Sequence, residues 1–151
     1  VMVVSTPVTA KGEKLKRLIE KYDAMHVVDV VALPRLVRFA QDDDFDSSDV
    51  IAYLKCQFAP YNLENYSELV LGCTHFPLVK SAIGKVVGES VRIYDGGEGT
   101  ARQAKCLLAA KNLCTDQEKG HICFESSAPE KEAYYEALYR KAAHIDSRVK
   151  L

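Results

Sequence analysis

Short apolar runs alternate with segments of helical periodicity along most of the chain. The apolar runs predict buried strands, and the amphipathic segments predict helices. The expected strands are 1–5, 26–32, 68–72 and 91–94, and the expected helices are 13–22, 36–41, 49–58, 77–87 and 100–113. Strands that alternate with helices across short turns are typical of a parallel sheet flanked by helices. The sequence therefore predicts an α/β fold built from about four βα units.

A polar break at residues 115–120 separates this pattern from the end of the chain. Beyond the break lie one strand-like run, residues 121–126, and one amphipathic segment, residues 129–143. We therefore expect an α/β domain over residues 1–114 and a C-terminal strand–helix appendage over residues 115–151.

Composition narrows the class of protein without identifying its chemistry. The chain has 151 residues, 48% apolar and 27% charged, which is ordinary for a globular domain. Its net charge of −1 gives no bulk electrostatic reason to expect nucleic acid or an anionic membrane as partner. No basic and apolar leader precedes the first strand, and the five cysteines show no disulfide framework, so we expect reduced thiols in the cytoplasm. A first residue of Val rather than Met suggests a processed or partial chain.

The residues suited to chemistry gather directly after the third expected strand. Cys73, Thr74 and His75 follow Gly72, and Pro77 opens the next expected helix. Ligands of open α/β sheets bind at the carboxyl ends of the strands, and the positive end of a helix dipole favours a thiolate. A thiolate beside an imidazole is a base, a nucleophile or a metal ligand, and the alternative is a buried structural cysteine with a surface histidine. A zinc site is disfavoured because the chain has no Cys-x-x-Cys or His-x-x-x-His spacing.

Two threonines at the exit of the first expected strand open onto the same edge of the sheet. The hydroxyls of Thr6 and Thr9, together with Thr74, are suited to binding a carboxylate or an ammonium group. The alternative is that they cap the helix that follows. The other cysteines are expected to pack in the core: Cys56, Cys106, Cys114 and Cys123.

The heptapeptide from Gly72 to Leu78 resembles the second cysteine motif of bacterial glutamate racemases, within the aspartate/glutamate racemase superfamily. Residues 6–9 resemble the Thr-x-x-Thr turn that opens the second domain of this family. Residues 93–97 and 121–127 resemble its later strand–turn and its terminal strand. The resemblance therefore covers nearly the whole chain, but only the second half of the family.

The resemblance implies a cofactor-independent enzyme that interconverts L- and D-glutamate by acid/base catalysis with two cysteines and no metal. Such an enzyme supplies D-glutamate for peptidoglycan. Cys73 is then the cysteine that deprotonates L-glutamate, and His75 assists proton transfer to and from it. Thr6, Thr9 and Thr74 are expected to hold the carboxylates and the ammonium group of the substrate.

The chain also departs from the family pattern. The Asp-Ser-Gly turn and the Cys-Asn-Thr motif of the family's N-terminal half do not occur, and Gln41 and Gly96 stand where an acidic residue and a serine are common. We therefore expect the chain alone to be inactive, and to associate with an N-terminal racemase half or with further copies of itself. Two other functions stay open: a decarboxylase or hydrolase of the superfamily that needs one cysteine, and a binding domain without catalysis.

Overall fold

The computed structural model describes residues 1–115 and 120–146, with side chains up to residue 142. By their internal contacts the residues form two compact units, Val1–Glu98 and Gly99–Leu151. The domain boundary expected at residues 114 and 115 stays a prediction.

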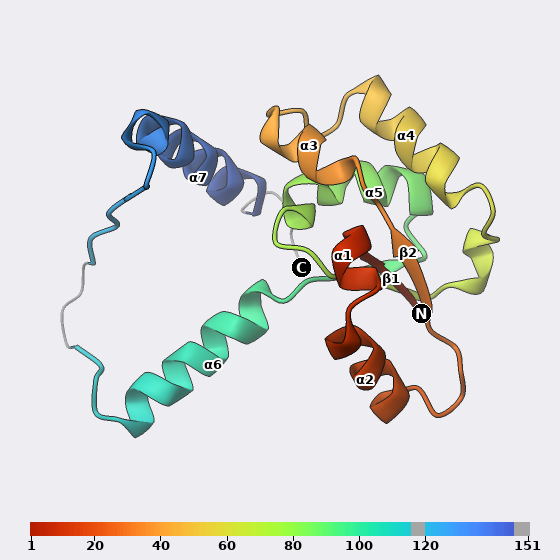
Figure 1. Cartoon of the computed structure of the whole chain (residues 1–151), viewed down its shortest axis with the longest axis horizontal. Coiled ribbons are helices and arrows are strands. Elements are labelled where there is room, and N and C mark those ends of the chain that lie inside the picture. The colour runs from red at the N-terminus through yellow and green to blue at the C-terminus, as the bar shows by residue number, and fades with distance from the viewer. Residues whose placement is uncertain (116–119, 147–151) are drawn as a thin grey trace. The chain divides into compact units, whose positions relative to one another are not determined.

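Unit 1 is built on a parallel sheet with the strand order β2-β1-β3-β4 (Figure 1). The central strand β1 pairs with β2 on one side and with β3 on the other, so that Val4 lies opposite Val31 and Leu71. The strands are short: β1 Met2–Ser5, β2 Asp29–Ala32, β3 Glu68–Leu71 and β4 Arg92–Tyr94. The α/β class and the four-stranded parallel sheet predicted from the sequence are confirmed.

Helices connect the strands of unit 1 where the apolar periodicity predicts them. Helices α2 (Glu13–Tyr22) and α3 (Leu36–Gln41) have the predicted bounds. Helix α4 (Ser48–Phe58) begins one residue earlier than predicted because Ser47 caps it: the Ser47 hydroxyl accepts a hydrogen bond from the Val50 N–H at 3.3 Å. The helices are α1 Pro7–Ala10, α2 Glu13–Tyr22, α3 Leu36–Gln41, α4 Ser48–Phe58 and α5 Lys80–Val87, with 3-10 helices η1 Leu63–Asn65 and η2 Phe76–Val79.

The core of unit 1 lies on one face of the sheet. Met2 and Val4 of β1 are buried, whereas Val3 between them is half-buried, as expected when successive side chains point to opposite faces. Helices α4 and α5 lie side by side and bring Phe58 and Ile83 into the same apolar cluster (Figure 1). Burial of this kind stabilises the fold by about 25 cal/mol per Å² of apolar surface.

The start of one helix and the presence of one strand differ from the predictions. The helix expected to start at Pro77 begins at Lys80, because residues 76–79 form the 3-10 helix η2, which buries Phe76 and Val79 together. The strand expected over residues 121–126 does not form: these residues pair with no strand of the four-stranded sheet.

Unit 2 consists of helices with little of their surface buried. It contains most of α6 Gly97–Ala110, then η3 Pro129–Lys131 and α7 Glu132–Asp146. The rings of Phe124 and Tyr139 lie 5.5 Å apart, whereas Leu107 and Leu108 are about half exposed. The core positions expected for the four other cysteines are wrong, because each of these thiols is exposed: Cys56 in unit 1 and Cys106, Cys114 and Cys123 in unit 2. No helix over the described residues is long and apolar enough to cross a membrane.

Gly72 is required by the close pairing of β1 with β3. Its N–H donates to the Val4 carbonyl oxygen at 2.7 Å. A Cβ at this position would lie 3.0 Å from that same oxygen and 3.3 Å from the Ser5 Cβ. Since both neighbours belong to β1, a side chain at Gly72 can be accepted only if the two strands separate.

Gly72→Ala is expected to lower the free energy of unfolding by about 1–3 kcal/mol, the usual cost of overpacking. Denaturant unfolding monitored by circular dichroism measures it. The matched control is Gly84→Ala in α5, where the nearest atom to a new Cβ is Ile93 Cδ1 at 3.7 Å. This control is expected to raise stability by about 0.5–1 kcal/mol, since alanine favours a helix. Equal effects of the two substitutions would contradict the assigned role of Gly72.

Tyr66 and Asp29 join the segment before β3 to the first residue of β2. The Tyr66 hydroxyl donates to Asp29 Oδ2 at 2.6 Å, and this bond raises the pKa of Tyr66 from its ordinary value to about 12. A group with a raised pKa in the folded state contributes stability that is full below its unfolded value, about 10. That contribution is lost as the pH rises through about 12.

Tyr66→Phe is therefore expected to reduce the fall in unfolding free energy between pH 10 and 12, and to remove the latest step in tyrosinate absorbance. Denaturant unfolding across this range measures the first effect. Tyr22→Phe, at an exposed ring, is the control and should behave as the unaltered chain does. An unchanged pH dependence in the Tyr66 variant would show that the bond contributes nothing.

Candidate functional site

The candidate site is the turn that follows β3 at the carboxyl edge of the sheet. Its backbone is held at both ends: Gly72 is bonded to β1, and the buried Phe76 and Val79 anchor η2. Within the turn the Phe76 N–H donates to the Cys73 carbonyl oxygen at 3.1 Å, and the Leu78 N–H donates to that of His75 at 3.1 Å. The segment that carries the predicted chemistry therefore has a defined backbone conformation.

The side chains of Cys73, Thr74 and His75 make no polar contact in the described residues, although Cys73 packs against the apolar core of unit 1. Cys73 and His75 are half-buried and Thr74 is exposed. Over the described residues no hydrogen bond or ion pair uses the thiol, the hydroxyl or the imidazole. A thiol and an imidazole two residues apart are thus both available to a bound molecule.

The helix dipole predicted to favour a thiolate at Cys73 is not positioned to do so. The dipole acts within about the first turn of a helix. Because α5 begins only at Lys80, Cys73 lies well before that first turn. Any stabilisation of a Cys73 thiolate therefore has to come from nearer groups, among which His75 is the closest in sequence.

Thr6 and Thr9 occupy the carboxyl edge of β1, the strand next to β3. The Thr6 hydroxyl caps α1, accepting from the Thr9 N–H at 3.3 Å and donating to the Thr9 hydroxyl oxygen at 3.0 Å. Thr6 thus caps the helix that follows it, which was the expected alternative to substrate binding. The pairing of Val4 with Leu71 brings this turn and the Cys73 turn to the same edge. Substrate binding by Thr6, Thr9 and Thr74 stays a prediction.

The sequence analysis did not predict the contact between Lys80 and Asp95 at this edge. Lys80 Nζ lies 3.5 Å from Asp95 Oδ2, and the two side chains are 21% and 25% exposed. Asp95 directly follows β4, and its Oδ1 also accepts from the Gly97 N–H at 2.9 Å. An acidic residue directly after a strand is the only sequence signal for this contact.

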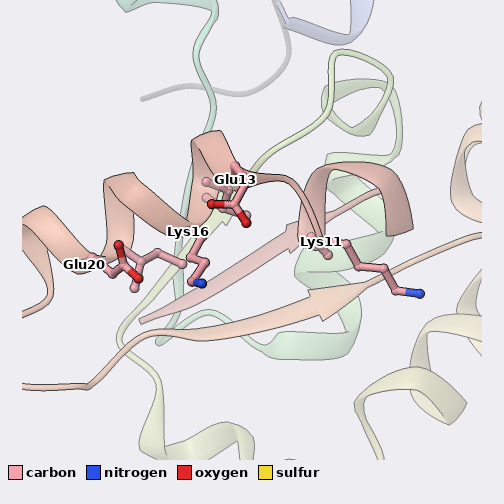
Figure 2. Close-up of a pocket in the computed structure, with 7 residues that line it drawn as sticks. Lys11, Glu13, Lys16 and Glu20 are labelled. Carbon is pink, nitrogen blue, oxygen red and sulfur yellow. The ribbon is translucent and has the colours of Figure 1, made fainter.

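An open hollow of about 500 Å³ lies elsewhere in unit 1, beside α2. Figure 2 shows that Glu13, Lys16 and Glu20 line it with charges of both signs, while Lys11 points away from them. It is lined by Ala10, Lys11, Glu13, Leu15, Lys16, Ile19 and Glu20. Its polar groups do not converge on one point, so the Cys73 turn remains the better candidate for chemistry. Within the described ranges no cluster of His, Cys, Asp and Glu could hold a metal ion.

Several solved glutamate racemases have the same fold as this chain. The *Escherichia coli* enzyme, in complex with L-glutamate and the activator UDP-MurNAc-Ala, matches with a TM-score of 0.72 at 24% identity, over 93% of this chain and 54% of the other. An isoform from *Bacillus anthracis* matches with a TM-score of 0.66 at 29% identity, over 77% of this chain and 44% of the other.

Curated relatives agree with the structural matches, although no protein-family model matches the sequence. A glutamate racemase of *Lachnospira eligens* is 64% identical over 120 residues, which are 80% of this chain and 45% of that protein. Glutamate racemase 2 of *Bacillus subtilis* is 43% identical over 112 residues, which are 74% of this chain and 42% of that protein. The chain thus spans about half the length of the curated relatives it matches. It is a relative of the glutamate racemases and corresponds to their C-terminal half.

Proposed function

We propose that the chain supplies one of the two acid/base cysteines of a cofactor-independent glutamate racemase. The observation that carries the proposal is the Cys73 turn itself. It holds a half-buried thiol that forms no hydrogen bond within the described residues, with an imidazole two residues later, at the carboxyl edge of a parallel sheet. The 64% identity to a glutamate racemase supports the same assignment.

Racemisation requires a proton to leave one face of the α-carbon and another to arrive on the opposite face. In the proposed reaction the Cys73 thiolate takes the α-proton of L-glutamate, the electrons of the Cα–H bond remain on the substrate as a carbanion, and a second thiol protonates its other face. His75 is placed two residues along the chain to pass protons to and from Cys73. The second thiol belongs to the half of the relatives that this chain does not span.

The substrate would be held by the hydroxyls that share this edge of the sheet. Glutamate carries two carboxylates and an ammonium group, and hydroxyls can bind either kind of charge. The exposed Thr74 hydroxyl has no partner within the described residues, whereas Thr6 and Thr9 bond to each other. A glutamate racemase of *Francisella tularensis* was solved with D-glutamate, which is the product expected here.

The proposed biological role is the supply of D-glutamate for peptidoglycan in the cytoplasm. The proposed partner is an N-terminal racemase half, and self-association through exposed apolar side chains is the other way to complete the structure. Without a second acid/base group the chain alone is expected to show essentially no racemisation, because removal of one such group costs about 10²–10⁴-fold in rate.

The first test is exchange of the α-proton in D₂O, followed by NMR on D- and L-glutamate separately. The chain is measured alone and after addition of the N-terminal half of a glutamate racemase. The chain alone is expected to exchange the α-proton of L-glutamate and not that of D-glutamate, because in the proposed reaction Cys73 acts on one face of the α-carbon. Cys73→Ala should abolish it, whereas Cys56→Ala, at an exposed thiol of α4, should leave it unchanged.

Other outcomes would redirect the proposal. No exchange with or without the added half, in a chain whose circular dichroism shows an intact fold, would favour a binding domain without catalysis. Net decarboxylation or hydrolysis that depends on Cys73 would favour an enzyme of the superfamily that needs one cysteine.

A further inference from the structure

The Asp95 carboxylate connects two turns at the carboxyl edge of unit 1. One oxygen lies 3.5 Å from Lys80 Nζ, and Lys80 begins the helix that follows the Cys73 turn. The other oxygen accepts from the Gly97 N–H at 2.9 Å, which closes the turn after β4. Both oxygens are therefore used, each by a different turn.

The surroundings of this carboxylate restrict its position. The Lys80 and Asp95 side chains are about three-quarters buried, whereas the Lys85–Asp46 pair on the same helix is 54% and 61% exposed. A Cβ at Gly97 would lie 3.0 Å from Asp95 Oδ1, so a side chain there would push the carboxylate out of its position. An ion pair shielded in this way is screened less by water and salt than an exposed one.

The Lys80 backbone passes this restraint to the Cys73 turn. Its N–H donates to the Pro77 carbonyl oxygen and thereby closes η2. The first residue of η2, Phe76, is in turn bonded to the Cys73 carbonyl oxygen. A chain of contacts thus runs from Asp95 through Lys80 and η2 to the backbone of Cys73.

We propose that Asp95 is a positioning residue for the Cys73 turn, acting through Lys80, and that it couples this turn to the one after β4. Because each carboxylate oxygen contacts a different turn, a movement of Asp95 with one turn weakens its contact with the other. As far as the reactivity of Cys73 is concerned, the proposal rests on the function proposed above. The restraint on the backbone of η2 does not depend on it.

Three substitutions separate the parts of this contact. Asp95→Asn removes the charge that attracts Lys80 but keeps an oxygen for the Gly97 N–H. Lys80→Met removes the cation and keeps most of the side chain's length, and Gly97→Ala displaces the carboxylate from the other side. Lys85→Met is the matched control, because it breaks an exposed ion pair of the same helix.

Two measurements on the full chain report on the turn. Hydrogen exchange follows the Phe76 and Leu78 amides, which are bonded within the turn. Alkylation resolved by mass spectrometry follows Cys73 across pH, with Cys56 as the internal reference. All three variants should speed hydrogen exchange of the two amides by about fivefold and slow alkylation of Cys73 near neutral pH by about the same factor. This factor corresponds to the largest contribution usual for a partly exposed ion pair.

In the double variant that combines Asp95→Asn with Lys80→Met, both rates should be close to those of either single variant, because each substitution removes the same interaction. Lys85→Met should match the unaltered chain. Unchanged amide exchange and an unchanged ratio of Cys73 to Cys56 alkylation in Asp95→Asn and Lys80→Met would overturn the proposal, even if their melting temperatures fell. If the unaltered Cys73 reacts no faster than Cys56, the proposed racemase function loses support, whereas the amide comparison still decides the role of Asp95.

Discussion

The parallel pairing of β1 with β3 is the interaction on which the candidate site depends. It places the exit of one strand beside the exit of the other, and so brings the Thr6–Thr9 turn and the Cys73 turn to one edge. The pairing continues past the end of β3 through the bond between the Gly72 N–H and the Val4 carbonyl oxygen. Because this approach disfavours a Cβ at Gly72, the residue before Cys73 is determined by strand geometry.

The sequence was a good guide where structure depends on neighbours in the chain. The stripe of Leu15, Leu18 and Ile19 was enough to give the bounds of α2, and the apolar runs located all four strands. The position of Cys73, Thr74 and His75 at a strand exit followed from the same pattern.

The failures share one cause, which is that they depend on partners distant in sequence. Residues 76–79 form a 3-10 helix because the core takes both Phe76 and Val79. Residues 121–126 are not paired with any strand of the described residues, and the thiol of Cys106 is exposed. The contact between Lys80 and Asp95 joins residues that no local pattern connects.

Gly72 and the exposed Thr74, two residues later, are two different kinds of position in this turn. At Gly72 the backbone admits no side chain, whereas at Thr74 a side chain reaches solvent and bonds to nothing in the described residues. A change of residue at Thr74 therefore alters what the turn presents to a ligand at little cost to the fold. The same scaffold is in this respect open to redesign, since new specificity can be introduced two residues after the glycine that lies closest to β1.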